Sequence, residues 1–123
     1  MNRVVITGMG AITPLGNDVA SFWDGLKNGK NGIDFITKFD TKDIDVHVAA
    51  EVKGFDPTLY MDRKEAKRMD LFCQYGIAAA LQAVEHSGIT KENTDFDRFG
   101  VIVSSGIGGL PTMEQQIIKM HDK

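Results

Sequence analysis

The stretch that decides the fold is Leu71-Phe-Cys-Gln-Tyr-Gly-Ile-Ala-Ala-Ala-Leu-Gln-Ala-Val-Glu-His-Ser-Gly88. Its apolar residues occupy almost every side of a helix, a pattern typical of a helix that other elements enclose. Upstream, Asp62 followed by Glu65 resembles a capping box, in which the first side chain accepts a hydrogen bond from a free backbone N–H. We therefore expect one long helix from this cap to about His86, closed by Gly88 and enclosed from Leu71 onward.

Three further apolar segments predict strands. Val4-Val5-Ile6 is a continuous run, which is the pattern of a strand buried on both faces. Val46–Lys53 alternates apolar and polar residues, so it predicts a half-exposed strand. Phe99–Val103 is short, apolar and rich in β-branched residues, and it leads into a glycine-rich loop. It predicts a third strand.

Two shorter helices complete the predicted order. Asn17 can cap a helix whose apolar residues recur at helical spacing, and Gly29 supplies a left-handed stop. Pro111 suits the first turn of a last helix, whose apolar positions are Met113, Ile117 and Met120. The resulting alternation of strands and helices favours an α/β layered fold with one domain over residues 1–123.

The composition is that of an ordinary soluble globular protein and argues against several functional classes. A formal net charge of −3 argues against a general nucleic-acid binder, because neutralising phosphates needs a surplus of Lys and Arg. The longest apolar stretch, around Ile77–Val84, is far shorter than the roughly 20 residues of a membrane-spanning helix. One cysteine, Cys73, leaves no disulfide framework, so we expect a cytoplasmic protein.

Small residues mark two places where backbones could approach closely. Gly8-Met9-Gly10 between a strand and a helix invites a dinucleotide-binding interpretation, but Thr13 stands where the G-x-G-x-x-G fingerprint has its third glycine. Glycines that permit a tight turn against neighbouring backbone are therefore the favoured interpretation. In the predicted central helix, Gly76 and Ala78–Ala80 would likewise let a neighbouring backbone come close.

The cysteine and the histidines do not form a recognisable catalytic or metal-binding pattern. Cys73 lies inside an apolar helix, with no neighbouring histidine and no helix N-terminus to activate it, so a structural role is favoured over a nucleophile. His47, His86 and His121 are far apart, with no carboxylate or thiol at ligand spacing. We expect no catalytic residue, metal or cofactor among them.

A basic stretch, Arg63-Lys-Glu-Ala-Lys-Arg68, places four cations in the first turns of the predicted helix, where the helix dipole disfavours positive charge. Lys64, Lys67 and Arg68 have the spacing that puts them on one face, which could dock an acidic partner. A solvated face paired with neighbouring acidic residues explains the pattern equally well. Gly106–Gly109 is open to two interpretations as well, a plain turn or a slim loop past which a long ligand runs.

Three segments carry a resemblance to a known family. They are Arg3-Val-Val-Ile-Thr-Gly-Met-Gly-Ala-Ile-Thr-Pro-Leu-Gly16, Arg68-Met-Asp-Leu-Phe-Cys-Gln-Tyr-Gly-Ile-Ala-Ala-Ala80 and Ser104-Ser-Gly-Ile-Gly-Gly109. In this order and spacing they resemble the β-ketoacyl-acyl-carrier-protein synthases, and the third is most similar to synthase II. The resemblance implies a thiolase-like layered fold of two similar α/β halves. This chain would form an incomplete N-terminal part of it, with the enclosed helix in an inner layer.

The resemblance also implies a reaction. In this family an active-site cysteine takes an acyl chain from a carrier protein, and malonyl-carrier protein is decarboxylated with the help of two histidines. The resulting carbanion then attacks the acyl thioester. The cysteine, in a Thr-Ala-Cys segment, and both histidines would follow Lys123, and Cys73 matches no catalytic position. We therefore expect a truncated, inactive chain whose parent is a homodimer that elongates fatty acids.

Two sets of binding residues follow from the resemblance. Lys64, Lys67 and Arg68 match basic residues that contact the acidic acyl-carrier protein, and Ile107 matches a residue that lines the acyl pocket. Two alternatives to a fatty-acid synthase remain. One is a polyketide ketosynthase or its chain-length-factor partner, and the other is a non-catalytic module that only binds a carrier protein.

Overall fold

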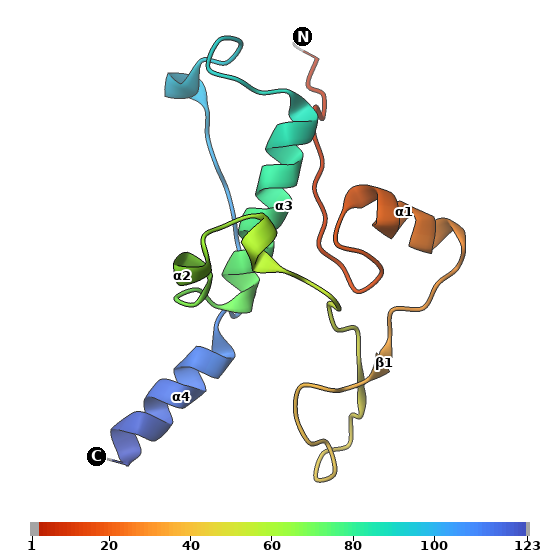
Figure 1. The fold of residues 1–123 in the computed structure, drawn as a ribbon, viewed down its shortest axis with the longest axis vertical. Coiled ribbons are helices and arrows are strands. Elements are labelled where there is room, and N and C mark those ends of the chain that lie inside the picture. The colour runs from red at the N-terminus through yellow and green to blue at the C-terminus, as the bar shows by residue number, and fades with distance from the viewer. Residues whose placement is uncertain (1–2, 123) are drawn as a thin grey trace.

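A computed structural model describes residues 3–122, so Met1, Asn2 and Lys123 of the expected domain 1–123 lie outside the described residues. Helix α3, Leu71–Ser87, lies at the centre, and the other segments are arranged around it (Figure 1). In chain order the other elements are α1 (Val19–Lys27), β1 (Asp34–Phe35), β2 (Val48–Ala49), the 3₁₀ turn η1 (Pro57–Leu59), α2 (Arg63–Ala66), the 3₁₀ turn η2 (Phe96–Arg98) and α4 (Leu110–His121).

The expected single helix beginning at Asp62 is wrong, because the structure divides it into α2 and α3. Asp62 does cap a helix, since its Oδ1 accepts a hydrogen bond from the Lys64 backbone N–H at 2.7 Å, but α2 ends at Ala66. The buried Gln74 side chain donates through Nε2 to the carbonyl oxygens of Ala66 and Met69, both at 2.9 Å. These bonds satisfy carbonyls that an uninterrupted helix would have used itself, and so stabilise the break.

The glycine stops are confirmed, whereas one predicted cap is wrong. Gly29 and Gly88 have φ values of 61° and 67°, the left-handed conformation that ends a helix without steric penalty. Asp18, not Asn17, caps α1, because Asp18 Oδ1 accepts from the Ser21 backbone N–H at 2.8 Å. The Asn17 amide instead donates to a carbonyl of a distant segment.

Two predicted strands are absent from the described residues. Val4–Ile6 and Phe99–Val103 have no strand structure, and Val4, Ile6 and Ile102 are 85 to 96% exposed. A strand that is buried on both faces needs neighbouring strands to bind its backbone groups, and no segment of residues 3–122 pairs with either run. These two strands were therefore wrongly predicted for this chain.

The predicted strand at Val46–Lys53 is confirmed only at its centre. Val48 and Ala49 form β2, which pairs antiparallel with β1 in the register Asp34 to Ala49 and Phe35 to Val48. The partner strand β1 was not predicted, because a strand of two residues is too short to show an alternating or continuous apolar pattern. This two-stranded ladder is the only sheet among the described residues. The expected α/β fold is therefore confirmed only in part, because helices predominate and strands are few.

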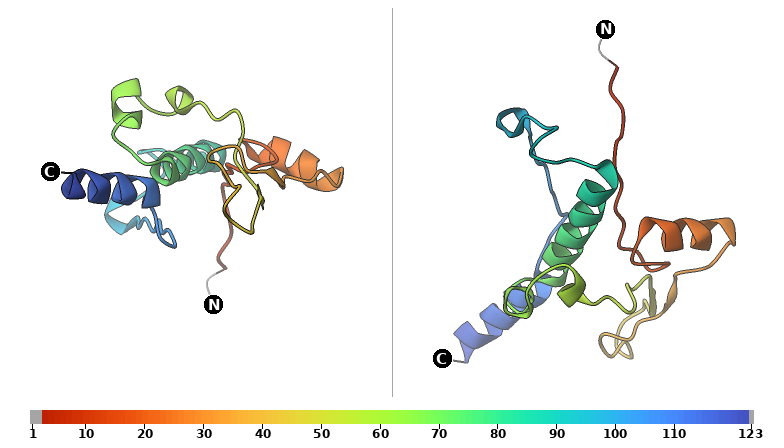
Figure 2. Two further views of the ribbon diagram at one scale, coloured as in Figure 1. Left: turned by 90° about the horizontal axis from the view of Figure 1, so that it is seen from below. Right: turned by 45° about the horizontal axis from the view of Figure 1, so that its top comes forward.

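The N-terminal segment runs beside α3 (Figure 1 and Figure 2). A β-carbon at Gly8 would overlap the carbonyl oxygen of Ala83, and one at Gly10 would overlap that of Ala79. Close approach of backbone, rather than a nucleotide, therefore explains these glycines. The contact places the start of the chain along the side of α3 that has the smallest residues.

The expected enclosure of α3 is wrong for the described residues. Ala66 and Ala78 are the only buried hydrophobic residues among them. Leu71, Leu81 and Val84 remain 44 to 47% exposed, because the N-terminal segment covers only the alanine side of the helix. No helix in the described part of the chain is long and apolar enough to cross a membrane.

Candidate functional site

The basic segment comprises Arg63, Lys64, Lys67 and Arg68. The first two lie in α2, Lys67 caps its C-terminal end, and Arg68 lies in the turn that follows. All four side chains are exposed, and none forms an ion pair with a carboxylate of residues 3–122. The alternative in which neighbouring acidic side chains pair with these cations is therefore not seen in the described chain.

The short length of α2 changes the electrostatic argument about this segment. A helix that continued past Arg68 would place all four cations near its positive N-terminal end. Because α2 ends at Ala66, Lys67 lies at the C-terminal end, where the helix dipole favours a cation. Of the four cations, only Arg63 and Lys64 lie within α2, whose four residues form a single turn, whereas Arg68 lies two residues before Asp70, the N-cap of α3.

Gln74 holds this segment in place, and sequence reasoning missed its role. Its side chain is 8% exposed and binds the backbone on both sides of Lys67 and Arg68, at Ala66 and Met69. The sequence did contain a signal, because an amide side chain inside a largely apolar helical stretch must find hydrogen-bond partners when buried. The basic segment is consequently presented from a fixed backbone.

The loop that carries Ile107 is anchored on the N-terminal end of α3. Ile107 itself is 74% exposed. The next residue, Gly108, has a φ of 81°, and a β-carbon there would lie 3.2 Å from Cζ of Phe72. A β-carbon at Gly109 would overlap the carboxylate of Asp70. Gly108 is thus required by its positive φ, and Gly109 by the close approach of Asp70. These two requirements favour a slim loop anchored on α3 over a plain turn.

Cys73 borders an apolar hollow of about 480 Å³ between α3 and the segment that precedes this loop. The thiol is half-buried, and the hollow contains neither a histidine nor a cation. Its lining residues are Met69, Phe72, Cys73, Gly76, Ile77, Ala80, Val103, Ser104 and Ser105. Ile107 is not among them, so the structure does not bring the predicted acyl-pocket residue to this hollow.

The three histidines lie apart from one another in the described chain. His86 Nδ1 accepts from the Met9 backbone N–H at 3.2 Å, and so ties the N-terminal segment to α3. His47 Nδ1 lies 3.2 Å from Thr41 Oγ1, and His121 lies near the end of α4. Within residues 3–122, no group of three or more His, Cys, Asp or Glu side chains could hold a metal ion.

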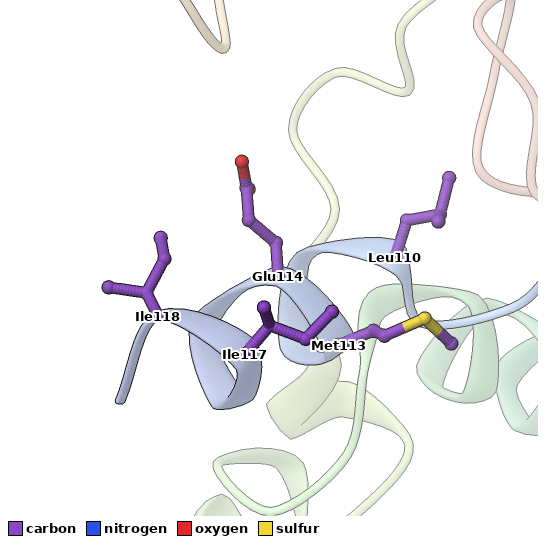
Figure 3. Close-up of a pocket in the computed structure, with 5 residues that line it drawn as sticks. All are labelled: Leu110, Met113, Glu114, Ile117 and Ile118. Atoms are coloured by element: carbon purple, nitrogen blue, oxygen red, sulfur yellow. The ribbon is translucent and has the colours of Figure 1, made fainter. Parts of the chain in front are cut away.

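Helix α4 begins where predicted, with Pro111 in its first turn, and projects away from the other elements (Figure 1). Figure 3 shows Leu110, Glu114 and Ile118 projecting from one side of this helix. Together with Met113 and Ile117, these three residues line a shallow hollow of about 280 Å³. Met113 is 54% exposed and Ile117 is 60% exposed. The apolar side chains of α4 therefore have little cover within the described chain.

The sequence pattern of the β-ketoacyl synthase N-terminal domain matches residues 1–123, which is the whole chain. The chain belongs to this family. The family expected from the three sequence segments is therefore confirmed, and the fold around α3 is that of a ketosynthase N-terminal domain.

Curated relatives in this family are called 3-oxoacyl-(acyl-carrier-protein) synthase 2. The protein of Synechocystis sp. is 46% identical over 121 residues, and that of Staphylococcus aureus (strain N315) is 48% identical over 121 residues. Each alignment covers 98% of this chain but only 29% of the relative. This ketosynthase chain thus spans less than a third of the length of the curated relatives it matches.

Solved structures of ketosynthases resemble the chain over the same extent. A β-ketoacyl synthase from Burkholderia phymatum STM815 superposes with a TM-score of 0.78 at 28% identity, over 98% of this chain and 30% of that one. A type II polyketide ketosynthase, solved in complex with its acyl-carrier protein, gives a TM-score of 0.75 at 26% identity, over 98% of this chain and 31% of that one.

Proposed function

We propose that this chain is the N-terminal part of a 3-oxoacyl-acyl-carrier-protein synthase II, which condenses an acyl thioester with malonyl-carrier protein during fatty acid elongation. Identity of 46 to 48% with synthase 2 relatives across 98% of the chain carries this proposal. The polyketide ketosynthase and a ketosynthase/chain-length factor are 26 and 35% identical, so the polyketide alternative has weaker support. The parent would be a cytoplasmic homodimer with the complete thiolase-like layered fold.

In this proposal the described residues supply scaffold and binding surface rather than chemistry. The nucleophilic cysteine and the two histidines would come from residues outside 1–123, and Cys73 would remain structural. Support comes from the setting of Cys73, whose hollow has no base to deprotonate it and no cation to stabilise a thiolate. The chain alone would then neither accept an acyl group nor release carbon dioxide from malonyl-carrier protein.

Lys64, Lys67 and Arg68 would form the docking site for acyl-carrier protein. Their exposure, and the lack of ion-pair partners within residues 3–122, leave these charges available to an acidic surface. The backbone that carries them is held by Gln74, so little ordering would be needed on binding. Ile107 would border the acyl pocket once the rest of the synthase is present.

A condensation assay tests the proposal. The full-length synthase should extend acyl-carrier protein with malonyl-carrier protein, and the 123-residue chain should not. Carbon dioxide release by the short chain, or a stable acyl adduct at Cys73, would contradict the assignment. The alternative of a binding module predicts a different result, namely saturable carrier binding by the short chain together with no condensation by the full-length protein.

Substitution of the docking residues tests the proposed carrier site. In the full-length synthase, replacing Lys64, Lys67 and Arg68 with Ala should weaken carrier binding by about 3- to 150-fold, at roughly 0.2–1 kcal/mol per exposed ion pair. The dependence of affinity on salt should also flatten, because fewer charges are paired on binding. A control that replaces Lys27, Lys91 and Arg98 makes the same change in net charge at other exposed positions. Equal effects from both variants, or unchanged affinity at low salt, would argue against the site.

A further inference from the structure

Lys67 and Arg68 lie in a tight turn between α2 and α3, and backbone hydrogen bonds define this turn. The Arg68 backbone N–H donates to the Glu65 carbonyl oxygen at 2.9 Å, and the Met69 backbone N–H donates to that of Ala66 at 3.2 Å. The turn therefore joins the two helices without continuing either of them, and both of its cations are exposed.

The Gln74 amide binds this turn on both sides of its cations. Its Nε2 has two N–H donors, and they reach the carbonyl oxygens of Ala66 and Met69, both at 2.9 Å. Ala66 lies directly before Lys67, and Met69 lies directly after Arg68. Since Gln74 belongs to α3, its side chain ties the backbone of the two cations to the central helix.

Gln74 also lies beside the surface that the basic segment forms. A hollow of about 360 Å³ between η1 and α2 is lined by Arg63, Lys67 and Gln74, together with Asp56, Pro57, Thr58 and Ala66. Asp56 is the one carboxylate in this lining, and its Oδ1 already accepts from the backbone N–H and the hydroxyl of Thr58. An approaching acidic surface would therefore meet two exposed cations here, with the buried Gln74 amide behind them.

We propose that Gln74 is a positioning residue of the carrier-protein site, which acts through Lys67 and Arg68 by fixing the backbone that presents them. The inference deepens the proposed function and rests on it, because the partner is an acidic carrier protein. Any freedom in the backbone of the cations must be lost when such a partner binds. The two Gln74 hydrogen bonds remove that freedom beforehand, so Gln74 raises the affinity without contacting the partner.

Matched substitutions in the full-length synthase test this role. Gln74→Met keeps the length of the side chain and every cation but removes both donors. It should weaken carrier binding by about 2- to 12-fold, the usual cost of ordering one flexible side chain on association. Gln82→Met is the control, because it removes another hydrogen-bonded amide of α3, whose partners are Ala11, Asn17 and Tyr60. It should bind carrier protein like the unaltered synthase, even where the two variants lose similar thermal stability.

Three further measurements separate positioning from a general loss of stability or of charge. Hydrogen exchange at the Met69 backbone amide should be faster in Gln74→Met and unaltered in Gln82→Met. The salt dependence of carrier affinity should stay as steep as in the unaltered synthase, since every cation is retained, whereas replacement of Lys64, Lys67 and Arg68 should flatten it. In a kinetic assay of Gln74→Met, the loss should appear in KM for the carrier-bound substrate rather than in kcat.

The outcomes separate this inference from the proposed function. Equal carrier affinity in Gln74→Met and the unaltered synthase, or an equal loss in Gln82→Met, would overturn the inference alone. An unaltered synthase that binds no carrier protein would overturn the proposed function, and the inference with it. If Gln74→Met fails to fold, the unaltered synthase still decides the question. Its Met69 amide should already be protected from exchange before carrier protein is added, and exchange at the rate of an unstructured peptide would overturn the role of Gln74.

Discussion

Gln82 joins three segments that are far apart in the chain. Its Oε1 accepts from the Ala11 backbone N–H at 3.1 Å, and its Nε2 donates to the Asn17 carbonyl oxygen at 2.8 Å and to Tyr60 Oη at 3.0 Å. One side chain on α3 thereby fixes both the turn before α1 and the approach to α2. Like Gln74, it was missed because the identity of an amide's partners depends on tertiary structure.

Asp34 provides a pH-dependent contact in the small sheet. Lys53 Nζ donates to Asp34 Oδ2 at 2.9 Å, and this hydrogen bond, with one from the Phe35 backbone N–H, lowers the pKa of Asp34 below its ordinary value. A lowered folded-state pKa means that the contact stabilises the ladder fully above the unfolded-state pKa. The stabilisation should be lost as pH falls through the lower, folded-state pKa.

Replacement of Lys53 by Met should therefore raise the pKa of Asp34, because the largest cause of the shift is removed while the backbone hydrogen bond remains. Carboxyl chemical shifts measured by NMR between about pH 2 and pH 6 would follow it, a window around the ordinary Asp value. Lys27→Met removes an equal charge at the end of α1 and should leave Asp34 unchanged. An Asp34 titration that is the same in Lys53→Met and in the unaltered protein would contradict this prediction.

Ile107→Phe should shift the full-length synthase toward shorter acyl groups. The added bulk would occupy part of the proposed acyl pocket, and one methylene in such a pocket is worth about 1–3 kcal/mol of discrimination. The measurement is kcat/KM over a series of acyl-carrier substrates of increasing length. Leu110→Phe, three residues further on at the start of α4, is a control for bulk near the same loop. An unaltered chain-length profile in Ile107→Phe would count against the pocket role.

Among the elements, those with local signals were predicted and those that depend on partners were not. The glycine stops of α1 and α3 and the proline start of α4 lie in the sequence itself, so these helices were found. The break between α2 and α3 depends on Gln74 reaching back to two carbonyls, which no periodicity reveals. The strands at Val4–Ile6 and Phe99–Val103 were expected from composition, yet a strand forms only where another strand can pair with it.

Gly10→Ala should destabilise the full-length protein by about 1–3 kcal/mol, the usual effect of forcing extra volume into a packed site. The added methyl group would overlap the Ala79 carbonyl oxygen in the middle of α3, where backbone cannot easily move aside. A fall in melting temperature measures the effect. Gly100→Ala is the matched control, because a β-carbon there has open space and Gly100 does not need a positive φ. Equal melting temperatures for the two variants would contradict the close approach.

At the scale of the whole molecule, the described residues bury very little. Large apolar side chains are exposed on every element except α2, including Trp23 at 59%, Ile117 at 60% and Met120 at 78%. A hollow of about 1080 Å³ also lies open between α1, α3 and the N-terminal segment. The sequence did predict an apolar central helix, but it could not show which of its sides this chain covers. The proposed docking residues were identified through the family resemblance rather than from the pattern of charges alone.

The isolated 123-residue chain should therefore self-associate or aggregate. Each large apolar side chain that gains full burial stabilises the assembly by roughly 1.5–3 kcal/mol, so contact between exposed faces is favourable. Light scattering after size-exclusion chromatography would give the mass, and binding of a hydrophobic dye would report the exposed surface. A sharp, well-dispersed NMR spectrum from a monomer would contradict the expectation.

The hydrogen bond between Met9 and His86 joins positions 77 residues apart, and this distance matters while the protein is being synthesised. Residues 8–10 leave the ribosome before the helix that they contact, because Ala79 and Ala83, which Gly8 and Gly10 approach closely, have not yet been translated. At about 5–20 residues per second, this wait lasts roughly 4–15 s. During that time the apolar side chains of Val4, Val5 and Ile6 are open to chaperones, and the segment cannot take up its contacts until α3 has emerged.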